Sequence, residues 1–296
     1  MSNNNATPSG TPTGKSQIHL TRLFQDAFDK RQADRKEFIE ETEATFRPFG
    51  KLVQGDPDIA KAAELARKRA TSHVPKPAAE PVKRKVRSQK VSAEDVTRVA
   101  PFDWNWTWSA TSGSAQIFIK SADQNTGNLS GQTYSGDNGG AGSVACAVGV
   151  FYQPTAANGL LDISAIPSIS WWYNASQLFD GVHSRGFIGF YVGEYTLEGD
   201  FVQAVVDQQI NLWDVSSHSS NSATNSGFPL LATFPVDNNH FYEVWVWARN
   251  DSEGVGGGFL NFSYSGGVTT VNVPEISIFE YSSQAISIAT MLFWQP

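Results

Sequence analysis

The sequence contains a single cysteine, Cys146, in 296 residues. One cysteine excludes an internal disulfide framework, and it also excludes a zinc site built from cysteine thiolates. Its neighbours form the apolar run SVACAVGVFY, and a free cysteine in such surroundings is usually buried and unreactive. We therefore expect Cys146 to behave as a small core side chain.

Basic residues are scarce after residue 100. Residues 101–296 hold 3 Lys and Arg against 16 Asp and Glu, a balance of 3 − 16 = −13, whereas residues 1–100 hold 19 against 13, or 19 − 13 = +6. Phosphate binding draws on clustered Lys and Arg, so the composition argues against nucleic acid as a partner of the acidic part. The contrast in charge also predicts two regions with separate roles.

Long apolar runs are missing too. The start of the chain, MSNNNATPSGTPTGKS, lacks the apolar core of a secretory signal. No apolar run approaches the ~20 residues that a membrane helix needs. We therefore expect no signal peptide, no transmembrane segment, and synthesis as a soluble protein in the cytoplasm. These features leave the final location open, and an extracellular particle is compatible with them.

Catalytic and metal-binding motifs are also missing. The five His are scattered and no HExxH pair occurs, so we assign no catalytic residue, and any metal site would have to be assembled by the fold. His240 follows the turn sequence DNN and is expected to begin a strand. The loops at 123–128 and 135–140 carry oxygen ligands of the kind that a structural Ca²⁺ binds, but they lack a complete calcium motif. We assign neither a metal nor another cofactor.

Three acidic residues, Glu194, Asp207 and Glu243, fall within expected strands. Two facing carboxylates in a cleft could hydrolyse a glycosidic bond. Scattered carboxylates on the outer face of a sheet are common, so a glycoside hydrolase is the least favoured interpretation.

The N-terminal region has the pattern of a tail followed by a helical arm. Residues 1–15 are low in complexity and predict a disordered tail. Helical periodicity follows, and we expect a helical hairpin over 16–72 in which Pro48 and Gly50 close the first helix. Lys and Arg alternate with Asp and Glu on its polar face. The apolar stripe is too small for a core of its own, so it should dock onto another surface. That docking face consists of Leu20, Leu23, Phe24 and Phe28.

Residues 73–100 predict a basic, proline-rich linker. Its KRKVR cluster includes Arg84, Lys85 and Arg87, which could form a cleavage site for a processing protease. Ser92 followed by Asp95 resembles a capping box, so the linker is expected to end in a short helix, SAEDVTRVA.

Residues 101–296 hold all nine Trp and all eight Tyr and show no helical periodicity. Strand-like segments separated by loops rich in Gly, Asn and Ser predict a mainly β fold: an antiparallel β-sandwich, jelly-roll-like, preceded by the α-helical arm. The expected loops include QNTGNLSGQTYSGDNGGAG and SSHSSNSATNSG. The expected strands are 102–109, 114–121, 143–153, 160–173, 184–195, 200–210, 228–235, 240–249, 257–264, 268–274 and 276–293.

Tryptophans recur at every second position in two of these strands. In FDWNWTWSA the rings alternate with polar residues, and in HFYEVWVWAR both faces are apolar. A strand covered on both faces needs a cover, and the helical arm is one candidate. We predict that these rings form a core or an interface. They are Trp104, Trp106, Trp108, Trp245 and Trp247.

Trp171, Trp172 and Tyr173 are consecutive, so at least one ring points away from the other two. Exposed aromatic rings can stack on the apolar face of a sugar, and these three residues are the expected platform if the chain binds carbohydrate.

The favoured function is a non-enzymatic structural protein whose sandwich self-associates, or attaches to a larger particle through its arm. Tail, helical arm and sandwich together resemble the architecture of virion and phage structural proteins. A homo-oligomer or a larger protein assembly is therefore the expected partner. A carbohydrate-binding, lectin-like module with a glycan partner and a two-part toxin activated by cleavage in the linker are the alternatives.

Overall fold

The computed structural model describes residues 15–54, 56–58, 61–62, 65, 95–136, 139–177, 181–257 and 261–282. These residues form a long helix, α1 (Lys15–Gln54), and strands β1 to β14; residues 57–58, 61–62 and 65, in the expected second helix, are also helical. Residues 1–14, most of the expected second helix and most of the expected linker, with Arg84, Lys85 and Arg87, lie outside the described residues. No helix within the described ranges has the length and apolarity needed to cross a membrane.

The first sheet is antiparallel, and each of its strands pairs with the next one across the sheet. In that order the strands are β2 (Trp104–Gly113), β5 (Gly139–Tyr152), β12 (His240–Gly257), β8 (His183–Thr196) and β9 (Phe201–Val215). The longest strand, β12, therefore lies in the middle of this sheet.

The second and third sheets, also antiparallel, lie on the other side of the core. The second sheet contains β3 (Gln116–Asp123), β4 (Asn128–Tyr134), β13 (Asn261–Asn272), β7 (Ser168–Gln177) and β10 (Ser219–Asn225), in that order. The third contains β1 (Asp95–Val99), β14 (Glu275–Ser282), β6 (Gly159–Ala165) and β11 (Leu230–Val236). Pairing of Gly256 in β12 with Phe262 in β13 joins the first two sheets.

One hydrophobic core fills the space between the first sheet and the other two. Asn250 of β12 donates to the carbonyl of Gly131 in β4 over 2.6 Å, so these strands face each other across that core. Core side chains from the three sheets include Val148, Val192, Val246, Ile169, Val271, Ile163 and Ile278. Cys146 belongs to the same core, and burial raises the pKa of its thiol to about 12.

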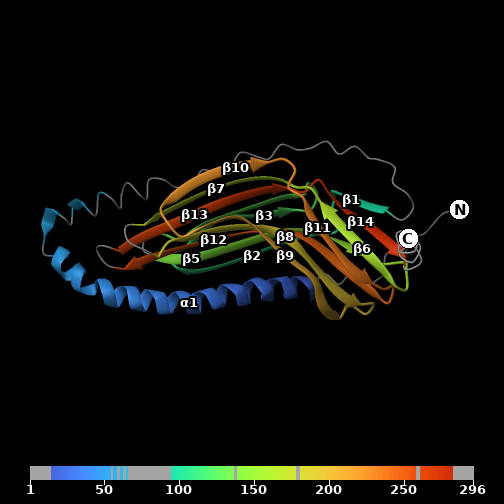
Figure 1. Ribbon diagram of the computed structural model, residues 1–296, viewed down its shortest axis with the longest axis horizontal. Helices are drawn as coiled ribbons and strands as arrows, with labels where there is room; N and C mark the ends of the chain where they lie inside the picture. Colours follow the sequence, from blue (N-terminus) through green and yellow to red (C-terminus); the bar gives the residue numbers. More distant parts are fainter. Residues whose placement is uncertain are drawn as a thin grey trace, which may run out of the picture.

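α1 lies along the outer face of the first sheet, against β2, β5 and β12, and its C-terminal part projects past the ends of the strands (Figure 1). The chain thus has a helix layer and two sheet layers, which confirms the predicted antiparallel β-sandwich with a helical N-terminal arm. The predicted end of the first helix at Pro48 and Gly50 is wrong, because the helix continues to Gln54. The helix therefore contains Pro48, although a proline there removes one backbone hydrogen bond and its ring crowds the carbonyl four residues earlier.

Several expected elements differ in the structure. The short helix expected at the end of the linker is wrong: Asp95–Val99 form β1, whose β-branched residues pair with β14 at the sheet edge. Two expected loops contain the strands β4 and β10, whose polar sequences are ordered by pairing with neighbouring strands.

Proline divides another expected strand. The segment 160–173 forms β6 and β7, because Pro167 cannot donate a hydrogen bond to a continuing ladder. Pro274 separates β13 from β14 in the same way. In contrast, the expected strands 257–264 and 268–274 are one strand, β13, over the described residues.

Candidate functional site: the arm-docking face

The outer face of the first sheet, where α1 lies, is called the arm-docking face. Alternation along β2 and β12 places the tryptophans of both strands on this face, while the residues between those of β12 face the core. All five rings are at most 9% exposed. They are Trp104, Trp106, Trp108, Trp245 and Trp247.

Small residues of β5 make room for these rings. β5 pairs with β2 on one side and β12 on the other, and it contributes Ala145, Ala147 and Gly149 between the two rows of tryptophans. A Cβ atom at Gly149 would lie 2.7 Å from the ring of Trp245, so only glycine fits under that ring. We call the space over Ala145 and Ala147, which α1 fills between the two rows, the groove; over Gly149 the rings of Trp104 and Trp245 close it by stacking at a centroid distance of 5.7 Å.

Phe24 of α1 occupies the middle of this groove. Its ring centroid lies 5.5 Å from that of Trp106, 6.0 Å from that of Trp108 and 5.3 Å from that of Trp247. Phe28, one helical turn further on, packs edge-on against Trp108 at 6.3 Å. Leu20 is also fully buried, and the predicted docking residue Leu23 is partly buried beside it.

Polar contacts fix the position of the helix in the groove. The indole nitrogen of Trp106 donates to the Thr21 hydroxyl over 3.2 Å, and the Ser112 hydroxyl donates to the side-chain oxygen of Gln32 over 2.7 Å. These bonds occur about three helical turns apart, so they set both the direction and the register of α1 on β2.

The groove continues into a buried charge network centred on Asp251 of β12. The Asp251 carboxylate accepts from Ser143 at 2.6 Å, and it lies 3.1 Å from the Arg31 guanidinium of α1 and 3.4 Å from Arg249 of its own strand. Arg185 and Arg31 also pair with Glu253, the next outward-facing residue of β12. Two of the three basic residues in 101–296 therefore serve this network.

The electrostatics of the network favour a charged Asp251. Burial alone would raise the pKa of this carboxyl group, but Arg249, Arg31 and Arg185 outweigh burial and hold its pKa below the ordinary value. Arg249 also places its guanidinium 4.4 Å from the ring centre of Phe187. Aromatic and ionic contacts thus meet on one surface.

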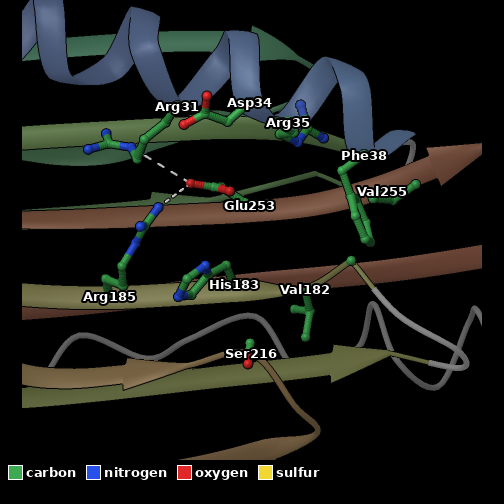
Figure 2. Close-up of a pocket in the computed structure, with 11 residues that line it drawn as sticks. Arg31, Asp34, Arg35, Phe38, Val182, His183, Arg185, Ser216, Glu253 and Val255 are labelled. Carbon is green, nitrogen blue, oxygen red and sulfur yellow. Dashed lines mark hydrogen bonds and ion pairs between the residues drawn. The ribbon is translucent and has the colours of Figure 1, made fainter. Parts of the chain in front are cut away.

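A pocket of about 320 Å³ opens where α1 leaves the network (Figure 2). Arg31, Arg35 and Phe38 of α1 line one side, and Arg185 and Glu253 line the sheet side. Figure 2 shows Arg31 and Arg185 converging on Glu253 from opposite sides. Arg35 donates to the Gly254 carbonyl, so Arg31 and Arg35 hold the arm to the sheet at this pocket, while Arg185 joins β8 to β12.

The predicted carbohydrate platform is divided between two faces. Trp171 and Tyr173 point the same way and pack against Trp213 of β9, at centroid distances of 5.3 and 5.7 Å. Trp172 points to the other face of β7 and is partly exposed. Sequence reasoning misses Trp213, because nothing in β9 shows that its ring reaches β7.

The three strand carboxylates, Glu194, Asp207 and Glu243, do not all lie on one face of the first sheet. Glu243 and Asp207 lie on the arm-docking side, on either side of Tyr191; after burial, their charges help to raise the pKa of Tyr191 to about 12. Glu194 points to the opposite face, toward Tyr242. None of these carboxylates lines the pocket in Figure 2.

Of the two loops considered for Ca²⁺, the first uses its carboxylate internally. Asp123 accepts from the Asn125 amide at 2.9 Å and from the Thr126 hydroxyl at 2.7 Å, which closes a turn. Residues 137–138 of the second loop lie outside the described residues.

No family model matches this chain, and no curated protein matches it. Among solved structures, TmCBM61 in complex with β-1,4-galactotriose is similar at 9% identity and a TM-score of 0.21, with 58% of this chain and 88% of that chain covered. The family 11 carbohydrate-binding module of the cellulosomal cellulase Lic26A-Cel5E of Clostridium thermocellum is similar at 10% identity and a TM-score of 0.18, covering 64% and 96%.

A structure of the infectious bursal disease virus Gt strain is similar at 10% identity and a TM-score of 0.22, covering 68% of this chain and 42% of that chain. With identities of at most 10% and TM-scores of at most 0.22, these similarities assign the chain no family, ligand or partner.

Proposed function

We propose that the chain is a non-enzymatic assembly protein, in which the arm-docking face binds an α1 helix either of its own chain or of a neighbouring copy. The proposal rests on one observation: the Phe24 ring packs between tryptophans of the groove, and Arg31 of the same helix forms an ion pair with Asp251. An amphipathic helix in an apolar groove is a recurrent mode of protein recognition. This groove selects a helix by both shape and charge.

The connection between helix and sandwich supports exchange between copies. The C-terminal end of α1 and strand β1 lie at opposite ends of the molecule (Figure 1). Residues 55–94 join them, 94 − 55 + 1 = 40 residues, which would span at most about 140 Å if all were fully extended. That length reaches back along one sandwich, and it equally reaches a sandwich beside it.

Concentration decides which arm occupies the groove. Burial of one Leu or Phe side chain contributes about 1.5–3 kcal/mol to the docking of the arm, and α1 buries Leu20, Phe24 and Phe28. A tethered arm competes at an effective concentration of about millimolar. A dilute chain should therefore hold its own arm, and a crowded assembly should hold a neighbour's arm.

Cross-linking across the groove tests this exchange. In a Gln32→Cys/Ser112→Cys variant, a short bis-maleimide should join side chains that are in contact in the native protein. We expect products within one chain in dilute solution and a rising share of products between chains as concentration increases, resolved by denaturing electrophoresis. Cys146 should not react, because it is buried in the core.

The matched control is Ala33→Cys/Ser112→Cys, since residue 33 is exposed on the opposite side of the same helix. This variant should give little cross-linking at any concentration. The proposal would be overturned by products confined to one chain at every concentration, together with the 32.3 kDa monomer mass in light scattering throughout.

A second candidate function, glycan binding, is favoured only by Trp172. Its ring lies on the face of β7 opposite to Trp171, next to Ser222 of the polar edge strand β10. If this ring stacks on a sugar, Trp172→Ala should abolish a signal on a glycan array, while Phe118→Ala, another exposed aromatic of the same sheet, should keep it. An array without any signal removes this candidate.

A further inference from the structure

Three ligand-type side chains meet away from the arm, where β8 ends and β12 begins. Glu194 is near the end of β8, His240 is the first residue of β12, and Asp237 lies in the turn before it. Strand pairing puts Tyr242 opposite Glu194, and His240 lies two residues before Tyr242, on the same face. The fold thus brings together residues that are 43 positions apart, 237 − 194 = 43.

The distances among these side chains match those around a metal ion. The Nδ1 atom of His240 lies 3.0 Å from each Asp237 oxygen and 3.4 Å from Oε1 of Glu194. The three ligand atoms all lie within 4.8 Å of one another. Ligands at about 2.1 Å from a tetrahedral ion are separated by about 3.4 Å, so a central ion needs only small movements.

Neighbouring groups orient the deepest ligand. The Tyr242 hydroxyl donates to Oε1 of Glu194 over 3.0 Å, and the Gln203 amide donates to Oε2 over 2.7 Å. The Asn239 backbone amide donates to Asp237 over 2.8 Å. Such outer contacts hold carboxylate ligands in place at metal sites. The Glu194 side chain is 9% exposed, while those of Asp237 and His240 are 31% and 27% exposed, which leaves the outer side open to water.

We propose that Glu194, Asp237 and His240 bind a divalent transition-metal ion of the zinc type, with water completing its coordination. Two carboxylates and one neutral imidazole match the charge of a divalent cation. An imidazole ligand favours Zn²⁺ over Mg²⁺ and Ca²⁺, which prefer oxygen donors alone. The ion ties the β11–β12 turn to β8 and leaves the arm-docking face untouched, so this site is independent of the assembly function.

Calorimetric titration of the full chain with Zn²⁺ alone, after treatment with EDTA and dialysis, tests the site. We expect one equivalent to bind, and we expect His240→Ala and Glu194→Gln each to weaken that binding by at least about tenfold. The control is His183→Ala: His183 contacts the Asp214 carboxylate at 2.6 Å but belongs to no three-ligand cluster among the described residues. It should bind Zn²⁺ as the native protein does.

Two further measurements keep the result interpretable. Circular dichroism in EDTA should show that each variant is folded, and Asp237→Asn, which keeps the shape of the side chain, should repeat the loss of affinity. Co²⁺ should give a visible d–d absorption that disappears in His240→Ala. The proposal is overturned if Zn²⁺ does not bind, or if His240→Ala and Asp237→Asn bind it as tightly as the native chain.

Discussion

Replacing Phe24 with alanine is expected to release α1 from the sandwich and to leave the sandwich folded. Phe24 is 2% exposed and touches three tryptophan rings. Loss of a buried Phe side chain costs about 3–5 kcal/mol, and here the cost reduces the free energy with which the arm docks on the sandwich. The core between the sheets shares no side chain with this contact, so it should survive.

Hydrogen exchange and tryptophan fluorescence measure the release. In Phe24→Ala, the amides of α1 should exchange faster, and emission should shift to the red as Trp106, Trp108 and Trp247 meet water. The control is Ile18→Ala, which removes a 61% exposed side chain from the same helix and should change neither signal. Unchanged protection of α1 would show that Phe24 does not hold the arm, and loss of protection in the core strands would show that arm and sandwich unfold together.

Asp251→Asn is the second substitution with a large expected effect. It removes one charge from a fully buried carboxyl group that faces three arginines. Breaking such a pair costs about 3–5 kcal/mol, because the buried cations lose their counter-charge. Denaturation in urea should show this loss. Asp26→Asn, which breaks an exposed pair with Arg22 at 3.8 Å, should change stability by less than about 1 kcal/mol.

The same carboxylate predicts how stability depends on pH. Its folded pKa lies below the ordinary value, so its contribution is complete above about pH 4, the unfolded pKa, and is lost as the pH falls further toward the folded pKa. Asp251→Asn should therefore lose less stability than the native protein on acidification from about pH 5 to about pH 3. Equal acid sensitivity, or native stability of the variant, would contradict this role.

The sequence predicts the class of fold and the docking stripe because both depend on local periodicity. The sequence itself shows the alternation in the strands that contain Trp106 and Trp247, and it shows the helical spacing of Leu20 and Phe24. It does not show the strands β4 and β10, since their Asn, Ser and Gly residues have low strand propensity and are held by partners distant in the chain. The sequence misleads at β1, because Ser92 and Asp95 imitate a capping box.

The candidate sites are harder to predict from the sequence, because they depend on how segments distant in the chain pack together. Arg31 and Arg35 belong to an alternating charge pattern that is typical of a solvated helix face, yet both turn toward the sheet and the pocket. Asp251, the partner of Arg31, belongs to no recognisable motif in the sequence. The turn before His240 predicts only the start of a strand, and its neighbour Glu194 is brought to it by the pairing of β8 with β12.

The overhang of α1 has a mechanical consequence. Phe38 is the last α1 residue in the lining of the pocket, and the helix continues through Gln54, a further 54 − 38 = 16 residues, or about 24 Å. A helix is stiff over that length, so the overhang holds the start of the 40-residue connection at a fixed distance from the groove. If neighbouring sandwiches exchange arms, inserting or deleting whole helical turns beyond Phe38 would change the reach of the arm between them without altering the groove.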